Sequence, residues 1–175
     1  AGFCYGVHRA VRMAEETADG GSPCVMLGPI IHNSSVIDYL KSKGVGLVQR
    51  VEDVPEGTAV LIRSHGEGRA VHEALAARGC PVIDATCPNV SRIHRIVEEA
   101  EGEGRQVIII GTPTHPEVEA IAGWCRSPLV LEGVDDLTEW LAQDENRREI
   151  PVTMVSQTTS TRLIWERCVE KAKKE

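Results

Sequence analysis

The sequence has 175 residues, of which 42% are hydrophobic and only 3% are aromatic. This is enough apolar material for one large or two small domains, with cores built from Val, Ile, Leu and Ala. A formal net charge of −7 argues against a nucleic-acid-binding protein or a polybasic membrane module, and no apolar run approaches the roughly 20 residues of a membrane span.

Helix signals and apolar runs alternate along the chain. The pattern predicts a helix over residues 7–18, a strand at "VMLG", a helix at "SSVIDYLKSKG" and a strand at "AVLIR". The strand "CPVIDAT" follows, then a helix over residues 88–101, the strand "QVIIIG", the helix "PEVEAIAGW" and the strand "VTMV". Val- and Ile-rich runs of this kind are typical of parallel strands covered on both faces.

Two stretches of the chain repeat one another. "GFCYGVHRAVRMAEETADGG" and "ATCPNVSRIHRIVEEAEGEG" align on Cys4 and Cys87, and each cysteine is followed 28 residues later by a histidine, His32 or His115. Self-similarity in a fixed register indicates an internal duplication. We therefore expect an α/β fold of tandem, pseudo-symmetric three-layer domains with mostly parallel sheets, at residues 1–86 and 87–175.

Polar residues that can bind ligands follow the predicted strands. In open parallel sheets, ligands bind beyond the carboxyl ends of the strands. Cys4 precedes a helix in the same way as Cys87, so it is expected at an equivalent position. The candidate site residues at these positions are Cys4, Cys87, His32, His65, His115, Glu117 and Thr158.

The cysteines fall into two groups. Cys4 and Cys87 precede helices, where the helix dipole and free N–H groups stabilise a thiolate. The other four, Cys24, Cys80, Cys125 and Cys168, are expected to be small buried side chains. No CxxC or similar zinc pattern occurs, and six cysteines are too few for a disulfide scaffold in a chain of this size. Reduced thiols favour a cytoplasmic protein.

The histidines fall into two groups as well. His32, His65 and His115 lie in loops after strands and are candidates for a binding site. The remaining three lie within predicted helices next to charged residues, and we expect them on solvated helix faces: His8, His72 and His94.

The residue types alone leave two metal ligands open. Zinc would take cysteine and histidine together in a tetrahedral site. An iron–sulfur cluster would take the cysteines and leave the histidines for a substrate. Histidines and helix N-termini together would also suit a phosphate group.

Six motifs in order narrow this choice. "GFCYGVHRA", "GPIIHN", "RSHG", "DATCPNV", "THPEVEAIAGW" and "SQTT" resemble those of the 4-hydroxy-3-methylbut-2-enyl diphosphate reductases, the LytB/IspH family, over essentially the whole chain. The resemblance implies a trefoil of three similar α/β domains around a [4Fe–4S] cluster, of which this chain would hold two. It also implies a reductive dehydroxylation that yields isopentenyl and dimethylallyl diphosphate, the last step of the non-mevalonate isoprenoid pathway.

The resemblance also implies residue roles. Cys4 and Cys87, one at the start of each repeat, would bind the cluster, and Glu117 would deliver protons to the leaving hydroxyl. Thr158 would hydrogen-bond the hydroxyl end of the allylic diphosphate substrate. The diphosphate pocket would be lined by His32, His65 and His115.

The same resemblance implies parts that this sequence does not contain. The third cluster cysteine belongs to a third repeat, and we expect the chain to be a fragment that is inactive in isolation. The partners implied are an allylic diphosphate and an external electron donor of the ferredoxin or flavodoxin type. A Cys/His metal- or phosphate-binding module without redox turnover is the alternative, in which Glu117 and Thr158 would have no task.

Overall fold

The computed structural model describes residues 4–174, which form two compact units divided between Ser91 and Arg92. The chain segment that crosses this division is the helix α4 (Pro88–Gly102). The division lies five residues beyond the boundary expected from the repeat, 86/87, and that boundary stays a prediction. Of the expected ranges 1–86 and 87–175, residues 1–3 and 175 lie outside the described residues.

The first unit contains a parallel sheet of four strands in the order β2-β1-β3-β4. Its strands are β1 (Cys24–Leu27), β2 (Gly46–Val48), β3 (Ala59–Ile62) and β4 (Val82–Asp84). The helical segments between and before them are α1 (Tyr5–Asp19), α2 (Ser34–Ser42), the short 3-10 helix η1 (Val51–Asp53) and α3 (Arg69–Ala77).

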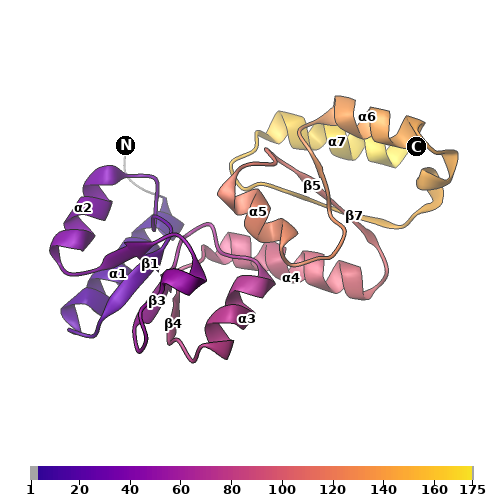
Figure 1. Cartoon of the computed structure of the whole chain (residues 1–175). Coiled ribbons are helices and arrows are strands. Elements are labelled where there is room, and N and C mark those ends of the chain that lie inside the picture. Colours follow the sequence, from indigo (N-terminus) through magenta and orange to yellow (C-terminus); the bar gives the residue numbers. More distant parts are fainter. Residues whose placement is uncertain (1–3, 175) are drawn as a thin grey trace. The chain divides into compact units, whose positions relative to one another are not determined.

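Side chains point alternately to the two faces of the sheet, and this produces the layers of this unit. Met26 of β1 and Leu61 of β3 pack with the apolar faces of α1 and α2. Their neighbours Leu27 and Ile62 point to the opposite face and pack with α3 and η1. Successive side chains of a strand point to opposite faces, so strands that are apolar at every position, as β1 and β3 are, must be covered on both faces. Figure 1 shows the helices around this sheet.

The second unit repeats this plan with fewer strands. Its parallel sheet has the order β6-β5-β7, with strands β5 (Gln106–Ile110), β6 (Leu129–Leu131) and β7 (Val152–Ser156). Its other helices are α5 (Pro116–Ala122), α6 (Val134–Ala142), the 3-10 helix η2 (Glu145–Glu149) and α7 (Arg162–Lys174). Figure 1 draws α6 and α7 on one side of β5 and β7, and α5 on the other.

The strand order of the two units supports the repeat found in the sequence. β1 lies between β2 and β3, just as β5 lies between β6 and β7, and all these pairs are parallel. The expectation of an α/β fold with parallel sheets is confirmed. The helix predicted at "SSVIDYLKSKG" is present as α2, and its N-cap is Asn33, whose side chain accepts a hydrogen bond from the Val36 N–H at 3.2 Å. None of the helices within residues 4–174 is both long and apolar enough to cross a membrane.

The stability of the first unit should depend on Leu61, which is fully buried in β3 and packs with α1 and α2. We expect Leu61→Ala to lower the free energy of unfolding by about 2–5 kcal/mol, because it removes buried methyl groups and leaves a cavity. Leu163→Ala is the matched control, since Leu163 is 64% exposed, and it should change stability by no more than about 0.5 kcal/mol. Urea unfolding followed by circular dichroism measures both, and equal effects would contradict this packing.

Candidate functional site

The carboxyl edge of the first sheet gathers three loops that carry candidate residues. Residues 28–33 follow β1, residues 63–68 follow β3, and residues 85–87 follow β4. The backbone of Ser64 joins all three, because its N–H donates to the Ile30 carbonyl at 3.2 Å and its carbonyl accepts from the Cys87 N–H at 2.9 Å. Ser64 is buried, so these bonds are shielded from water. The loops with His32, His65 and Cys87 are thereby fixed to one another.

The two candidate thiols belong to this edge. Cys4 is exposed at the N-cap of α1, where its side chain makes no capping hydrogen bond, and its carbonyl accepts from the His8 N–H at 3.0 Å. Cys87 is half-buried directly before α4, and its carbonyl accepts from the Ser91 N–H at 2.9 Å. Both cysteines lie before the division at Ser91, so both belong to the first unit.

Gly6 brings the start of α1 against Cys87. A Cβ atom at Gly6 would lie 2.7 Å from the Cys87 Sγ and 3.1 Å from its Cβ, so only a glycine fits there. Gly6 is two residues from Cys4 on the first turn of α1. The close approach therefore places the Cys87 sulfur beside the helix end that Cys4 caps.

Arg9 fixes the same approach from the next turn of α1. Its guanidinium donates to the Thr86 carbonyl at 3.1 Å and to the Asp84 carbonyl at 3.5 Å. Asp84 in turn accepts from the Thr86 N–H at 2.9 Å and from the Thr86 hydroxyl. The turn that leads into Cys87 is thus held at both its backbone and its side chains.

His32 and His65 lie next to each other although 33 residues separate them in the chain. Their ring centroids are 4.9 Å apart and the rings are tilted by 41°. His32 is exposed and His65 is half-buried. Two adjacent imidazoles at the carboxyl edge of a parallel sheet can offer N–H donors to an anionic group without adding two permanent charges.

The second unit holds a buried carboxylate. Glu117, in the first turn of α5, is 2% exposed. Its Oε1 accepts from the Thr158 N–H at 2.5 Å and its Oε2 accepts from the Thr158 hydroxyl at 2.8 Å. Thr158 itself is exposed. A buried carboxyl that reaches the surface through a threonine hydroxyl can exchange a proton with a ligand outside.

His115 stands at the start of the same helix. It is the N-cap of α5, and its Nδ1 accepts from the Glu117 N–H at 3.1 Å. An accepting Nδ1 is unprotonated, so the ring's proton lies on Nε2 in the neutral form. The cap thus determines which nitrogen of His115 can donate to a ligand.

These residues form two groups, each within one unit. Cys4, Cys87, His32 and His65 gather at the carboxyl edge of the first sheet, and His115, Glu117 and Thr158 gather at that of the second.

Of the remaining cysteines, Cys24 and Cys168 are buried as the sequence predicts, whereas Cys80 and Cys125 are only half-buried. Cys24 begins β1 and Cys168 is fully buried in α7, and burial raises the pKa of both thiols. Burial, followed by the charge of Glu101, raises the pKa of Cys125 to about 11. These thiols are protonated at neutral pH, which does not suit a metal ligand.

One histidine differs from the expectation. The sequence predicts His94 on a solvated helix face, yet it is buried and stacks on Trp124 with ring centroids 5.3 Å apart and an angle of 22° between the rings. The helical pattern of α4 places it toward the core, and the apolar surface of Trp124 covers its ring. Nearby charges in the sequence are a misleading signal here.

Sequence reasoning also missed four residues that build the site: Gly6, Arg9, Ser64 and Gln157. Arg9 stands out in the sequence only as a match to Arg92 within the repeat. Ser64 and Gln157 fall at predicted strand ends, with no role that the pattern assigns. Their contribution is made by backbone groups or by contacts with distant segments, which no local pattern encodes.

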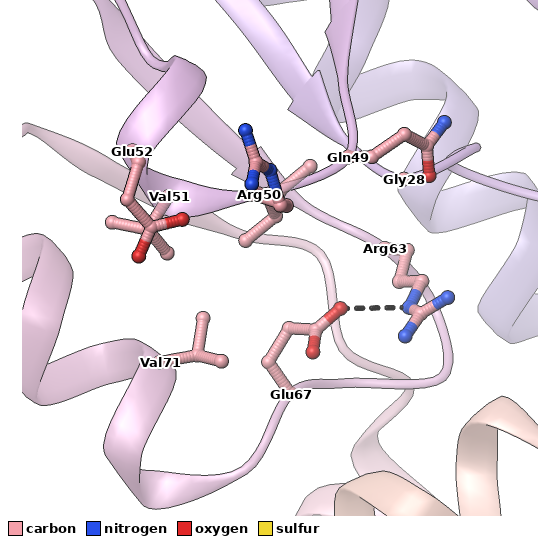
Figure 2. A pocket seen from close by; sticks show the side chains of 9 residues that line it. Gly28, Gln49, Arg50, Val51, Glu52, Arg63, Glu67 and Val71 are labelled. Atoms are coloured by element: carbon pink, nitrogen blue, oxygen red, sulfur yellow. Dashed lines mark ion pairs between the residues drawn. The ribbon is translucent and has the colours of Figure 1, made fainter.

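A cleft of about 330 Å³ lies on the α3 side of the first sheet's carboxyl edge. Figure 2 shows the ion pair between Arg63 and Glu67 inside it, with Nε and Oε1 2.8 Å apart. Both side chains are mostly buried, and they close the loop that carries His65 at its two ends. The cleft contains none of the seven candidate residues.

Whether a metal or a cluster fits the described residues depends on Cys4 and Cys87. Within residues 4–174, no group of three or more His, Cys, Asp or Glu side chains is arranged to hold a metal ion. Cys4 and Cys87 suit two of the thiolate ligands of a larger cluster, and Gly6 leaves space beside the Cys87 sulfur. A lone zinc ion would need more ligands than this part of the chain brings together.

The fold and its strand-edge residues define a class of protein: α/β proteins of repeated parallel units that present thiols, imidazoles and a buried carboxylate at their carboxyl edges. A family model described as LytB protein matches residues 1–175, and the chain belongs to this family. The resemblance seen in the six motifs is confirmed.

Individual relatives agree with this assignment. The 4-hydroxy-3-methylbut-2-enyl diphosphate reductases of Ralstonia nicotianae and Aquifex aeolicus are each 40% identical to this chain, over 90% and 91% of its length. The matches cover 48% and 54% of those two proteins. The chain therefore spans about half the length of these curated relatives.

Solved structures match as well. The structure described as (E)-4-hydroxy-3-methyl-but-2-enyl diphosphate reductase, the terminal enzyme of the non-mevalonate pathway, has a TM-score of 0.84 and 38% identity, over 99% of this chain and 61% of that one. The E-1-hydroxy-2-methyl-but-2-enyl-4-diphosphate reductase of Plasmodium falciparum has a TM-score of 0.89 and 28% identity, over 99% and 54% of the two chains.

Gly6→Ala tests the approach of α1 to Cys87. The added methyl group would overlap the Cys87 side chain, so we expect a loss of about 1–3 kcal/mol in the free energy of unfolding. Gly102→Ala is the matched control: Gly102 is also helical, and a Cβ atom there would have no neighbouring atom within 4 Å, so this variant should gain up to about 1 kcal/mol. Urea unfolding distinguishes the two, and a Gly6→Ala protein as stable as wild type would contradict the close contact.

Proposed function

We propose that this chain works as part of a 4-hydroxy-3-methylbut-2-enyl diphosphate reductase, an iron–sulfur enzyme of isoprenoid synthesis. The observation that carries the proposal is the buried Glu117 carboxylate with both oxygens bonded to the exposed Thr158. A metal- or phosphate-binding module has no use for such a pair. A reaction that expels hydroxide as water needs an acid within hydrogen-bond reach of the leaving oxygen.

The reaction proposed is a reductive dehydroxylation. The carbon–oxygen bond at the substrate's C4 breaks, and two electrons and two protons are consumed. One proton leaves with the hydroxyl group as water, and the other is added to carbon, giving isopentenyl or dimethylallyl diphosphate. The electrons come from an external donor of the ferredoxin or flavodoxin type. We place this chemistry in the cytoplasm.

Glu117 is the proton source in this proposal, and Thr158 links it to the substrate. Thr158 is the exposed member of the pair, so its hydroxyl can accept a hydrogen bond from the substrate's hydroxyl while it donates to the carboxyl group. The carboxyl group itself is buried, so the exposed Thr158 is its route of contact with a substrate.

The diphosphate would be bound by imidazoles. The neighbouring rings of His32 and His65 offer donors at the edge of the first sheet. His115 would add its Nε2–H, because its Nδ1 accepts the capping hydrogen bond of α5. Neutral or singly charged donors of this kind can orient a diphosphate without holding its product too tightly.

Cys4 and Cys87 would hold the [4Fe–4S] cluster, together with a further cysteine from beyond the described residues. When bound, such a cluster passes electrons singly and offers a Lewis-acidic iron where a protein ligand is missing. The role of this chain is to keep its two thiols together, through Gly6, Arg9 and the backbone of Ser64.

Glu117→Gln in the complete reductase tests the acid. The amide keeps the size of the side chain but has no acidic proton, so we expect kcat to fall by about 10²–10⁴-fold while KM stays within about threefold. Glu119→Gln is the matched control, since Glu119 lies on the same helix and is exposed, and its kcat should be unchanged. Viologen-driven turnover and iron content are the measurements, and loss of iron in Glu117→Gln would mean that this residue serves the cluster instead.

His32→Ala tests the diphosphate site. Loss of one donor should raise KM by about tenfold with kcat within about threefold, because the contact is present in both the ground state and the transition state. His72→Ala is the control, on α3 away from the strand ends. Equal KM values for wild type and His32→Ala would remove His32 from the binding site.

A further inference from the structure

Gln157 is the first residue after β7, and its side chain joins two loops at the carboxyl edge of the second sheet. The Thr112 N–H, after β5, donates to Gln157 Oε1 at 3.2 Å. Gln157 Nε2 donates to the Thr159 hydroxyl at 2.6 Å. Gln157 itself is 8% exposed, whereas Thr112 and Thr159 are exposed, so both bonds are half-buried.

The surrounding backbone is shaped to this side chain. The Gln157 N–H donates to the Ile110 carbonyl at 2.9 Å and continues the β5–β7 ladder by one residue. A Cβ atom at Gly111 would lie 2.8 Å from the Val118 Cγ2, 2.9 Å from the Gln157 Cβ and 3.0 Å from its Oε1. A glycine is therefore needed at position 111 beside both Val118 and Gln157.

Thr158 lies between the two anchored residues. Gln157 is bound to the β5 loop, and Thr159 is bound to Gln157, so the single residue between them has little freedom to move. Thr158 is also the residue whose N–H and hydroxyl both bond Glu117. The geometry of the Glu117–Thr158 pair therefore depends on the amide of Gln157.

We propose that Gln157 is a positioning residue, which acts by holding Thr158 against Glu117 and makes no contact with substrate. The inference rests on the proposed function, in which that pair delivers protons. An amide is suited to the task because it accepts one hydrogen bond and donates another at the same time. A Met side chain has a similar length but lacks both the acceptor and the donor. An Asn side chain has both, but it is shorter.

Gln157→Met in the complete reductase should lower kcat by about tenfold and leave KM within about twofold, because the acid is misplaced while diphosphate binding is intact. Gln106→Met is the matched control. Gln106 opens β5 at the opposite edge of the same sheet, where its amide bonds the carbonyls of Val107 and Ser127. Its kcat and KM should both equal those of wild type.

A wild-type kcat in Gln157→Met, or a raised KM with unchanged kcat, would overturn the proposal. Should Gln157→Met fail to fold, Thr159→Val and Gln157→Asn provide milder losses of the same contacts. Each should lower kcat by about threefold or more, and wild-type kinetics in both would overturn the proposal equally.

The double variant Glu117→Gln with Gln157→Met separates positioning from direct catalysis. If Gln157 acts only through Glu117, its loss should lower the residual rate of Glu117→Gln by less than about twofold. A further tenfold loss would show an independent role and contradict the inference.

Hydrogen exchange of the Thr158 amide gives a readout that needs no substrate. In Gln157→Met we expect this amide to exchange about tenfold faster, with no change in Gln106→Met, because its bond to Glu117 opens more often. If Gln157→Met exchanges faster but the wild-type protein has no reductase activity, the positioning role stands and the proposed function fails. If the wild-type enzyme is active but Gln157→Met exchanges at the wild-type rate, the positioning role fails and the proposed function stands.

Discussion

The backbone of Ser64 holds the first unit's site together. Its N–H binds the loop after β1 and its carbonyl binds the loop after β4, so three strand ends are joined through one buried residue. A buried peptide group must satisfy its hydrogen bonds within the protein, and here the partners are the loops that carry His32 and Cys87. The position of each candidate ligand is therefore tied to the others, and movement of one loop would break bonds of the next.

In the second unit, side chains rather than a backbone group hold the strand-end loops together. Glu117 is buried and bonded through both oxygens to Thr158. The amide of Gln157 joins the loop after β5 to the loop after β7. In both units the rigid elements are parallel strands, whose carboxyl ends all fall at one edge. The duplicated sheet thus provides two similar platforms, one with thiols and imidazoles and one with an acid, an alcohol and an imidazole.

Family membership and geometry support one another at specific residues. The motifs "GFCYGVHRA" and "DATCPNV" contain the glycine and the cysteine that touch, Gly6 and Cys87. "THPEVEAIAGW" and "SQTT" contain Glu117 and Thr158, which bond to each other across 41 residues of chain. Each pair of motifs therefore meets in one contact of the fold.

The sequence by itself determined the α/β class, the parallel strands, the repeat and the candidate residues, because periodicity, strand ends and motifs are local properties. It could not place His94, whose burial against Trp124 depends on how α4 packs with the segment after α5. Nor could it show that Gly6 lies on Cys87, that Arg9 holds the turn before it, or that Gln157 spans two loops. These features depend on contacts between segments tens of residues apart, so only the tertiary structure decided them.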